Sequence, residues 1–511
     1  MNKYIIKLAL AMLVVFTVSC DDYLDVNKDP DVLGDIDSPK RILPITQVGI
    51  ANQLMAYDFG FGGAYWAQYW TQSYTASQFK NLCEFEETEF EDAYEELTAG
   101  VLNDLKRIKD LSTEEENKGY AYIAEALSIF TWQVVTDMWG DVPYSEALKG
   151  NEGIFHPEFD TGEVIYADLM TRVNALLNTD LTDVTIEEDF DFVFAGNMSY
   201  WESFVASLKL KLMMRQSETS GYDNAAVISF IESGVTFLSS SAKIDGNVWD
   251  DTREGKRHPM REFQEGGANY VSQNVLGSKS FIDYLDSNND PRLDVLFTAP
   301  DGGHQGAFFG DFDSKEDSSG NGTADDDEEY SEALFTADMD LMIISEWEVN
   351  FYLAEAYARA SNDANAKMYF DKGVTASLAQ NGITATDIID TGYAVWTSGT
   401  VEENIKQIAM QKWVANANYQ FVESFFERNR TKYPAVDDID IKLDREQAFL
   451  VLTAKGNEGD ITISVAGRDK TNGKLPASAV YPAAVLNRNI NAPSQKTDLL
   501  QKVWWDKKAG I

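Results

Sequence analysis

The sequence has few of the residues that most often carry catalysis. Its 511 residues include only three histidines and two cysteines, and the histidines lie far apart, at positions 156, 258 and 304. No two histidines have the spacing of a helical zinc site, and CxxC, GxSxG and P-loop motifs are absent. We therefore expect a protein that is not an enzyme. A glycoside hydrolase with an unrecognised acid pair stays open, because such a pair is defined by its separation in space.

Positive charge is also scarce. The chain carries 42 Lys and Arg against 84 Asp and Glu, a formal net charge of −42. A nucleic-acid-binding protein needs clustered cations to neutralise phosphates, so this balance excludes nucleic acid as a partner. It is compatible with neutral ligands, divalent cations or a solvated position outside the cell.

Long apolar runs are absent, since no segment approaches the roughly 20 residues that a membrane-spanning helix needs. The N-terminus instead combines Lys3 and Lys7 with a short apolar run, Leu8–Phe16, which is typical of a secretion signal. We predict a signal peptide at 1–19, lipidation of Cys20, and a polar tether over 20–37. Plain secretion is the alternative, because Thr17 stands where stricter lipidation signals have Leu.

Only Cys83 then remains as a thiol, and one thiol cannot form an internal disulfide. It has no histidine nearby in sequence and is followed by Glu84, an anion that disfavours the thiolate. We therefore expect Cys83 to be buried and inert.

Helical spacing dominates the rest of the chain and predicts an all-α fold with minor short strands, in a single domain over 38–511 with a loop-rich insertion at about 245–330. Ser112–Glu115 has the pattern of a capping box before a helix with apolar residues from Tyr120 to Met138, and Ser345–Glu348 has the same pattern. Further helices are expected at 43–57, 90–110, 161–177, 200–217, 223–238 and 402–427.

One helix pair matches the tetratricopeptide pattern. Leu353, Ala354 and Tyr357 would lie on its first helix, and Phe370 and Gly373 at the matching positions of its second. The pattern predicts a scaffold of stacked helix pairs.

Aromatic residues are plentiful, at 12% of the chain. In the densest cluster Trp66, Trp70 and Tyr74 recur every four residues, with Gln72 beside them. Sugar rings stack their C–H faces on aromatic rings and hydrogen-bond to amides, so this composition suits a glycan-binding platform. A core helix with an aromatic stripe is an equally good interpretation. In the loop-rich middle, Trp249 and Arg253 are further candidate ligand contacts.

An acidic loop suggests a calcium site. Its oxygen-bearing residues fall at the spacing of an EF-hand loop, with Gly322 at the position of the sharp turn. The predicted ligands are Asp317, Ser319, Asn321, Asp325 and Glu328. Ala324 stands where such loops prefer a bulkier apolar residue, so a solvated acidic loop is the alternative. No motif in the sequence requires a cofactor, and Ca²⁺ bound in this loop is the cofactor that the sequence suggests.

The segment Met138–Leu148 includes the motif GDVPYSEAL. This motif and several others resemble those of the SusD/RagB family of outer-membrane lipoproteins. The chain is most similar to the branch whose mature sequence opens with NKDPN, here Asn27–Asp31. Departures are Ala206, where the family often has Asn, and Asn429, where it has Arg. Further matches follow in order at Pro157–Thr161 with Ile165–Tyr166, Ser207–Lys211 with Met214–Arg215, Asn289–Leu293, Glu348–Ala356, Gln411–Trp413, and Arg430–Thr431 with Pro434.

The resemblance implies a surface-exposed lipoprotein of the outer membrane that binds a nutrient, chiefly glycan, on a loop-rich side. It also implies a partner, a TonB-dependent outer-membrane transporter of the SusC-like type, whose mouth the protein covers as a lid. The alternatives are a peptide or other nutrient as ligand, or a purely structural transporter subunit. The family's binding residues follow no strict motif, so none is carried over to this chain.

Overall fold

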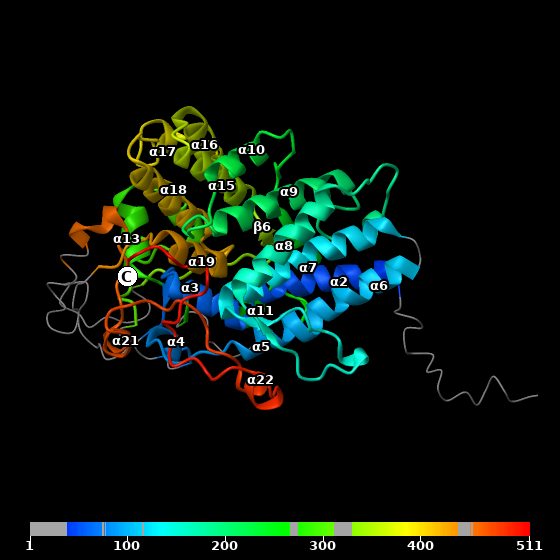
Figure 1. Cartoon of the computed structure of the whole chain (residues 1–511). Helices are drawn as coiled ribbons and strands as arrows, with labels where there is room; N and C mark the ends of the chain where they lie inside the picture. The colour runs from blue at the N-terminus through cyan, green and yellow to red at the C-terminus, as the bar shows by residue number, and fades with distance from the viewer. Residues whose placement is uncertain are drawn as a thin grey trace, which may run out of the picture.

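The computed structural model describes residues 38–73, 76, 78–114, 117–265, 274–310, 330–437, 450 and 453–510. Within this part the chain is predominantly helical, as the spacing predicts (Figure 1). The α-helices of the first half are α2 (Pro39–Met55), α3 (Gly62–Trp66), α4 (Lys80–Cys83), α5 (Glu91–Glu95), α6 (Leu102–Glu114), α7 (Lys118–Trp139), α8 (Gly162–Leu177), α9 (Met198–Arg215) and α10 (Asn224–Ile231).

The second half begins with short helices and continues with longer ones. These are α11 (Pro259–Glu265), α13 (Lys279–Ser287), α14 (Leu293–Leu296), α15 (Glu346–Arg359), α16 (Asp363–Gln380), α17 (Asp387–Asp390), α18 (Val401–Asn416), α19 (Phe421–Thr431), α21 (Val465–Thr471) and α22 (Ala483–Arg488). Single turns of π- or 3₁₀-helix are η1 (Tyr57–Phe61), η2 (Glu96–Val101), η3 (Gly150–Glu152), η4 (Glu188–Phe190), η5 (Gly246–Val248) and η7 (Gly456–Glu458).

Strands in the described residues are short and form three separate antiparallel pairs. The pairs are β1 (Trp70–Thr71) with β5 (Leu276–Gly277), β2 (Val142–Pro143) with β3 (Phe159–Asp160), and β4 (Ala242–Ile244) with β6 (Leu341–Ile344). They fasten loops to the helical body rather than build a layer of their own, which confirms the predicted all-α class.

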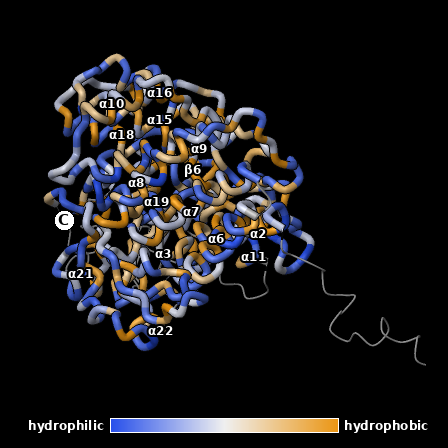
Figure 2. The backbone as a smooth tube through the Cα atoms, turned by 45° about the vertical axis from the view of Figure 1, so that its right-hand side comes forward, coloured by the Kyte–Doolittle hydropathy of each residue, from blue (hydrophilic) through white to orange (hydrophobic). Residues whose placement is uncertain are grey.

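Helix α7 is the centre of the first half of the body. It packs against α6 on one side and α8 on the other, and nearly all of its side chains are buried. A helix that is apolar all round belongs inside a protein. Figure 2 shows apolar segments concentrated where the helices pack together and polar segments over the outer loops.

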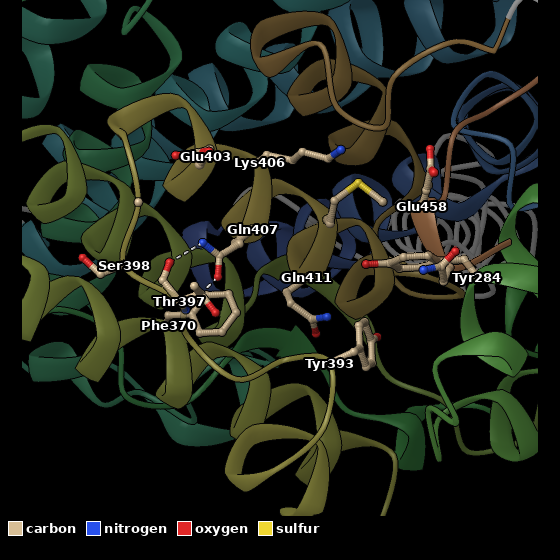
Figure 3. A pocket seen from close by; sticks show the side chains of 13 residues that line it. Tyr284, Phe370, Tyr393, Thr397, Ser398, Glu403, Lys406, Gln407, Gln411 and Glu458 are labelled. Carbon is tan, nitrogen blue, oxygen red and sulfur yellow. Dashed lines mark hydrogen bonds between the residues drawn. The ribbon is translucent and has the colours of Figure 1, made fainter. Parts of the chain in front are cut away.

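The predicted helix pair is confirmed. Helices α15 and α16 form the most extensively packed pair of elements, joined by Ala360–Asn362. Gly373 on α16 is needed for the close approach, because a Cβ there would come within 2.8 Å of the Phe351 ring. Ser345 caps α15 as expected, with its Oγ accepting a hydrogen bond from the Glu348 backbone N–H at 3.1 Å. A cavity opens beside this pair, between α13, α16 and α18 (Figure 3).

Several helix boundaries differ from the prediction. The helix expected at 223–238 ends at Ile231, and the one expected at 90–110 is divided among α5, η2 and α6. Ser112 lies inside α6, and the side chain of Asn117 caps α7 instead by accepting from the Tyr120 N–H. The predicted helix 402–427 is two helices, because the chain turns between Asn416 and Phe421. Local capping patterns cannot exclude a better cap a few residues downstream.

No helix in the described ranges combines the length and the apolar composition needed to cross a membrane.

Candidate functional site

The aromatic segment predicted as a ligand platform runs through the interior. Trp66 and Trp70 are 1% and 0% exposed. The spacing of four residues suggested one continuous helix, but α3 ends at Trp66 and β1 begins at Trp70. The segment passes between core elements, so both rings are enclosed on all sides.

The neighbours of these rings are themselves core residues. Trp66 packs against Phe425 with ring centroids 5.0 Å apart, and Trp70 packs edge-on against Phe421 at 4.5 Å. Gln72 is 2% exposed, and its Nε2 donates to Asn274 Oδ1 at 2.7 Å. The prediction that Trp66, Trp70 and Gln72 contact a ligand is therefore wrong. Tyr74, the fourth member of this set, lies outside the described residues.

Trp249 and Arg253, the other two predicted contacts, lie at the surface. The indole of Trp249 is half-buried, and its Nε1 donates to the Met339 carbonyl at 3.2 Å. The Arg253 side chain is 68% exposed, and its nearest carboxylate, Asp250, lies 3.8 Å away. Both remain free to meet a ligand, and that they do so remains a prediction.

His258 fixes this region to the core. Its ring is buried, meets the Trp249 indole edge-on at 6.0 Å, and accepts a hydrogen bond at Nδ1 from the Met260 N–H. Burial, with a smaller contribution from the charge of Arg261, lowers the pKa of His258 to about 4. The imidazole is therefore neutral at physiological pH, where it holds the start of α11 rather than transferring protons.

Sequence reasoning missed Tyr57, which lies on η1 at the other end of α11. Its ring is 40% exposed and rests on Phe79 and Phe263, with centroids 4.8 and 5.6 Å away. A cavity of about 490 Å³ adjoins it, and the polar residues lining this cavity are Asn52, Gln53, Asp58, Asp92, Glu95 and Glu96. One tyrosine at a helix end has no periodic signal, and only the three-dimensional structure shows what surrounds it.

Tyr57 contacts α11 through Phe263, and Trp249 contacts His258 immediately before α11, with Arg253 in the loop between Trp249 and His258. We call Tyr57, Trp249 and Arg253 together the α11 face. It has two partly exposed aromatic rings and one exposed cation, and the cavity bordered by amides and carboxylates adjoins Tyr57. Aromatic surfaces next to hydrogen-bond donors and acceptors can hold a polyhydroxylated ligand.

The predicted calcium ligands, Asp317, Ser319, Asn321, Asp325 and Glu328, lie outside the described residues, as does the lipidation site Cys20. A calcium site in that loop remains a prediction. In the ranges that the structure does describe, no three His, Cys, Asp or Glu residues gather in a way that could hold a metal ion.

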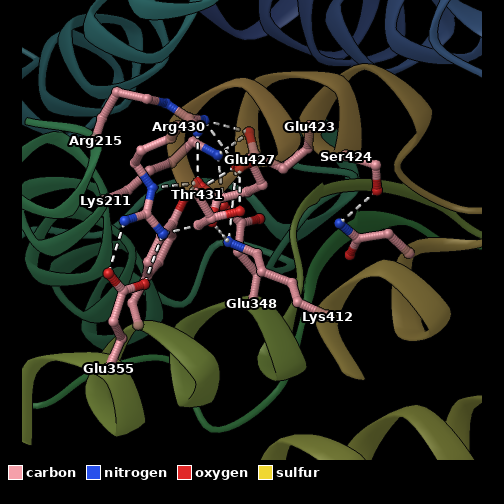
Figure 4. A network of polar contacts seen from close by, with 12 residues as sticks. Lys211, Arg215, Glu348, Glu355, Lys412, Glu423, Ser424, Glu427, Arg430 and Thr431 are labelled. Carbon is pink, nitrogen blue, oxygen red and sulfur yellow. Dashed lines mark hydrogen bonds and ion pairs between the residues drawn. The ribbon is translucent and has the colours of Figure 1, made fainter. Parts of the chain in front are cut away.

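A dense cluster of charged side chains lies in the interior of the described part of the chain (Figure 4). Glu423 receives two hydrogen bonds from Arg215 Nη2, both 2.7 Å, and one from Lys211 at 2.6 Å. Burial alone would raise the pKa of Glu423, but the charges of Arg215, Lys211 and Lys412 outweigh it and lower the pKa. Glu427, one turn further along α19, is likewise paired, with Arg430 and Arg215.

These carboxylates do not make a hydrolytic acid pair. A general acid for glycoside cleavage needs a raised pKa so that it is protonated at the working pH. Glu423 and Glu427 have lowered pKa values and are 6% exposed each, held between cations. Their role is to join α9, α15, α18 and α19.

The family comparison identifies the kind of protein that this scaffold represents. Residues 36–449 match the profile of a SusD-like family described as starch-binding and associating with the outer membrane. The chain belongs to this family. The resemblance read from the sequence motifs is thereby confirmed, and the family is one defined by binding rather than by catalysis.

Solved structures of SusD homologues share the fold. One from Bacteroides uniformis has 19% identity and a TM-score of 0.69, covering 91% of this chain and 99% of that one. A homologue described as chitin-binding, from Flavobacterium johnsoniae, has 15% identity and a TM-score of 0.67, covering 92% and 98%. No curated protein matches the chain.

Proposed function

We propose that this SusD-like protein binds oligosaccharide at the cell surface and delivers it to a TonB-dependent outer-membrane transporter, for which it acts as a lid. The observation that carries the proposal is the α11 face, where Tyr57 presents aromatic surface beside the polar groups of its cavity and Trp249 adds a second partly exposed ring. The family's description as starch-binding and the chitin-binding SusD homologue support glycan as the ligand class. A lipid on Cys20 would hold the protein at the outer membrane.

The test is titration calorimetry with a panel of soluble starch and chitin oligosaccharides, comparing the wild type with Tyr57→Ala, Trp249→Ala and Arg253→Ala. Stacked ring pairs contribute about 0.5–1.5 kcal/mol beyond the apolar area they bury. Since about 1.4 kcal/mol is a factor of ten in affinity, we expect each aromatic variant to bind roughly tenfold more weakly or worse. Arg253→Ala should lose less affinity than the aromatic variants, because the Arg253 guanidinium is exposed.

Phe155→Ala is the matched control, since Phe155 is also an exposed aromatic residue, at 73%, but lies in the 150–158 loop. Equal loss in Phe155→Ala and Trp249→Ala, or no binding by any oligosaccharide, would refute the assignment of the α11 face. Shortened oligosaccharides after incubation would instead show a hydrolase. Co-purification of the transporter with the full-length lipoprotein tests the partnership.

A further inference from the structure

The cavity between α13, α16 and α18 lies apart from the α11 face and shares no lining residue with it. Its volume is about 470 Å³, within the range of pockets that take small molecules, about 300–1,000 Å³. Figure 3 shows its wall, with Tyr284 and Tyr393 on one side and the loop of Thr397 and Ser398 on the other.

The floor of the cavity holds an amide whose orientation is fixed. Gln411 is 3% exposed, and its Oε1 accepts a hydrogen bond from Arg292 Nη2 at 2.9 Å. Arg292 is itself fully buried and held by Asp290. Since Arg292 can only donate, it fixes Oε1 toward itself and leaves Nε2 directed to the cavity.

Two polar residues that line this cavity have hydrogen-bonding atoms without a protein partner. Among the described residues, neither Gln411 Nε2 nor the hydroxyl of Tyr284 has a hydrogen-bond partner, although Tyr284 is only 5% exposed. Both residues line the cavity, so these two atoms are open to a hydrogen bond from a molecule that enters it. A ligand that pairs with them replaces water there and is held in one orientation.

The walls of the cavity are preorganised. The rings of Tyr284 and Tyr393 are perpendicular, with centroids 5.6 Å apart, and the Tyr393 hydroxyl is fixed by its hydrogen bond to Asp290. On the opposite side, Gln407 binds the backbone of Thr397 twice, accepting from its N–H at 2.9 Å and donating to its carbonyl at 2.7 Å. A site whose walls are already ordered loses little entropy when a ligand binds.

We propose that this cavity is a second binding site, which takes a single neutral sugar unit independently of the α11 face. The perpendicular tyrosines offer apolar surface to the C–H faces of a sugar ring. The hydroxyl groups of a sugar can accept hydrogen bonds from Gln411 Nε2 and Lys406 and donate one to Glu458. A single polyol can therefore pair with both the donors and the acceptor of this cavity. An anion is disfavoured by the Glu403 and Glu458 carboxylates and by the net charge of the chain.

The experiment uses the full chain with Tyr57→Ala and Trp249→Ala together, so that sugar binding at the α11 face does not contribute. Ligand-observed NMR and calorimetry with glucose, N-acetylglucosamine and maltose should show saturable binding by this variant. Adding Ser398→Trp, which fills the cavity from its exposed rim, or Gln411→Leu should weaken binding at least tenfold. Thr375→Trp, an equally large change at an exposed position of α16 outside the cavity, should leave it unchanged.

The absence of sugar binding by the Tyr57→Ala, Trp249→Ala protein would overturn the proposal without touching the function assigned to the α11 face. Equal effects of Ser398→Trp and Thr375→Trp would also overturn it. Saturable binding of a small amine in place of the sugars would overturn the ligand class. Ser398→Trp keeps the test decisive if Gln411→Leu, which removes a partner of buried Arg292, fails to fold.

Discussion

Replacing Glu355 by Gln should destabilise the protein by several kcal/mol, because Glu355 neutralises buried cations. Its two carboxylate oxygens accept one hydrogen bond each from Nη1 and Nη2 of Arg430, at 2.7 Å and 2.6 Å, and one also accepts from Arg359 Nε at 2.9 Å. Burial would raise the pKa of Glu355, but Arg430 and Arg359 outweigh it and lower the pKa from 4.5 to about 2. Both Glu355 and Arg430 are almost completely buried.

Two independent estimates of the magnitude agree. Lowering a pKa from 4.5 to about 2 corresponds to about 3 kcal/mol of stability at pH 7. Removing one partner of a buried ion pair costs about 3–5 kcal/mol, because the other charge is left uncompensated. Against a total stability of about 5–15 kcal/mol, this is a large share. The measurement is guanidinium unfolding of Glu355→Gln and wild type, followed by tryptophan fluorescence.

The pH dependence gives the sharper test. The pKa of Glu355 is lower in the folded protein than in the unfolded chain, so the unfolded chain binds more protons as the pH falls. The stability that ionised Glu355 contributes is therefore complete above about pH 4.5 and is lost as the pH falls towards 2. The free-energy gap between wild type and variant should be about 1.4 kcal/mol smaller at pH 3.5 than at pH 7. Asp371→Asn, which breaks an exposed pair with Lys367, is the control and should cost about 1 kcal/mol or less. A gap below about 1 kcal/mol at pH 7, or one that does not shrink with acid, refutes the reasoning.

Two further predictions concern single buried groups. Cys83 is fully buried, and burial raises its pKa. In a protein carrying Cys20→Ser, Ellman's reagent at pH 8 should therefore not modify the native chain but should modify one thiol per chain after denaturation. A rapid reaction of the native protein would contradict the burial of Cys83. Burial lowers the pKa of His258 to about 4. Its imidazole should therefore show no titration by NMR between pH 5.5 and 8, and a midpoint near 6.5 would mean that the ring is solvated.

The sequence predicted the scaffold best where a residue type has one structural use. Gly373 was expected at the close approach of a helix pair, and it lies against Phe351. Ser345 was expected to cap α15, and it does. Cys83 was expected to be buried, and its side chain is 0% exposed. In each case the local pattern and the packing favour the same conformation.

The aromatic cluster shows where sequence reasoning stops. A spacing of four residues is the same for a buried helical stripe and for an exposed platform, so Trp66 and Trp70 could not be assigned from the sequence. Which elements cover a segment is decided by residues distant in the chain, here Phe421 and Phe425 on α19. Tyr57 was missed for the same reason, because its exposure depends on α11, some 200 residues later.

The charge of the chain also divides between interior and surface. The buried cluster contains the carboxylates of Asp137, Glu348, Glu355, Glu423 and Glu427 and the cations of Lys211, Arg215, Lys412, Arg430 and, at its edge, Arg359. With Glu218, which pairs with Arg359, six negative and five positive charges nearly cancel there, so almost all of the net −42 is carried by the rest of the chain. An exterior this acidic repels anionic glycans as it does nucleic acid, which favours neutral sugars as ligands at the α11 face and in the cavity beside α18.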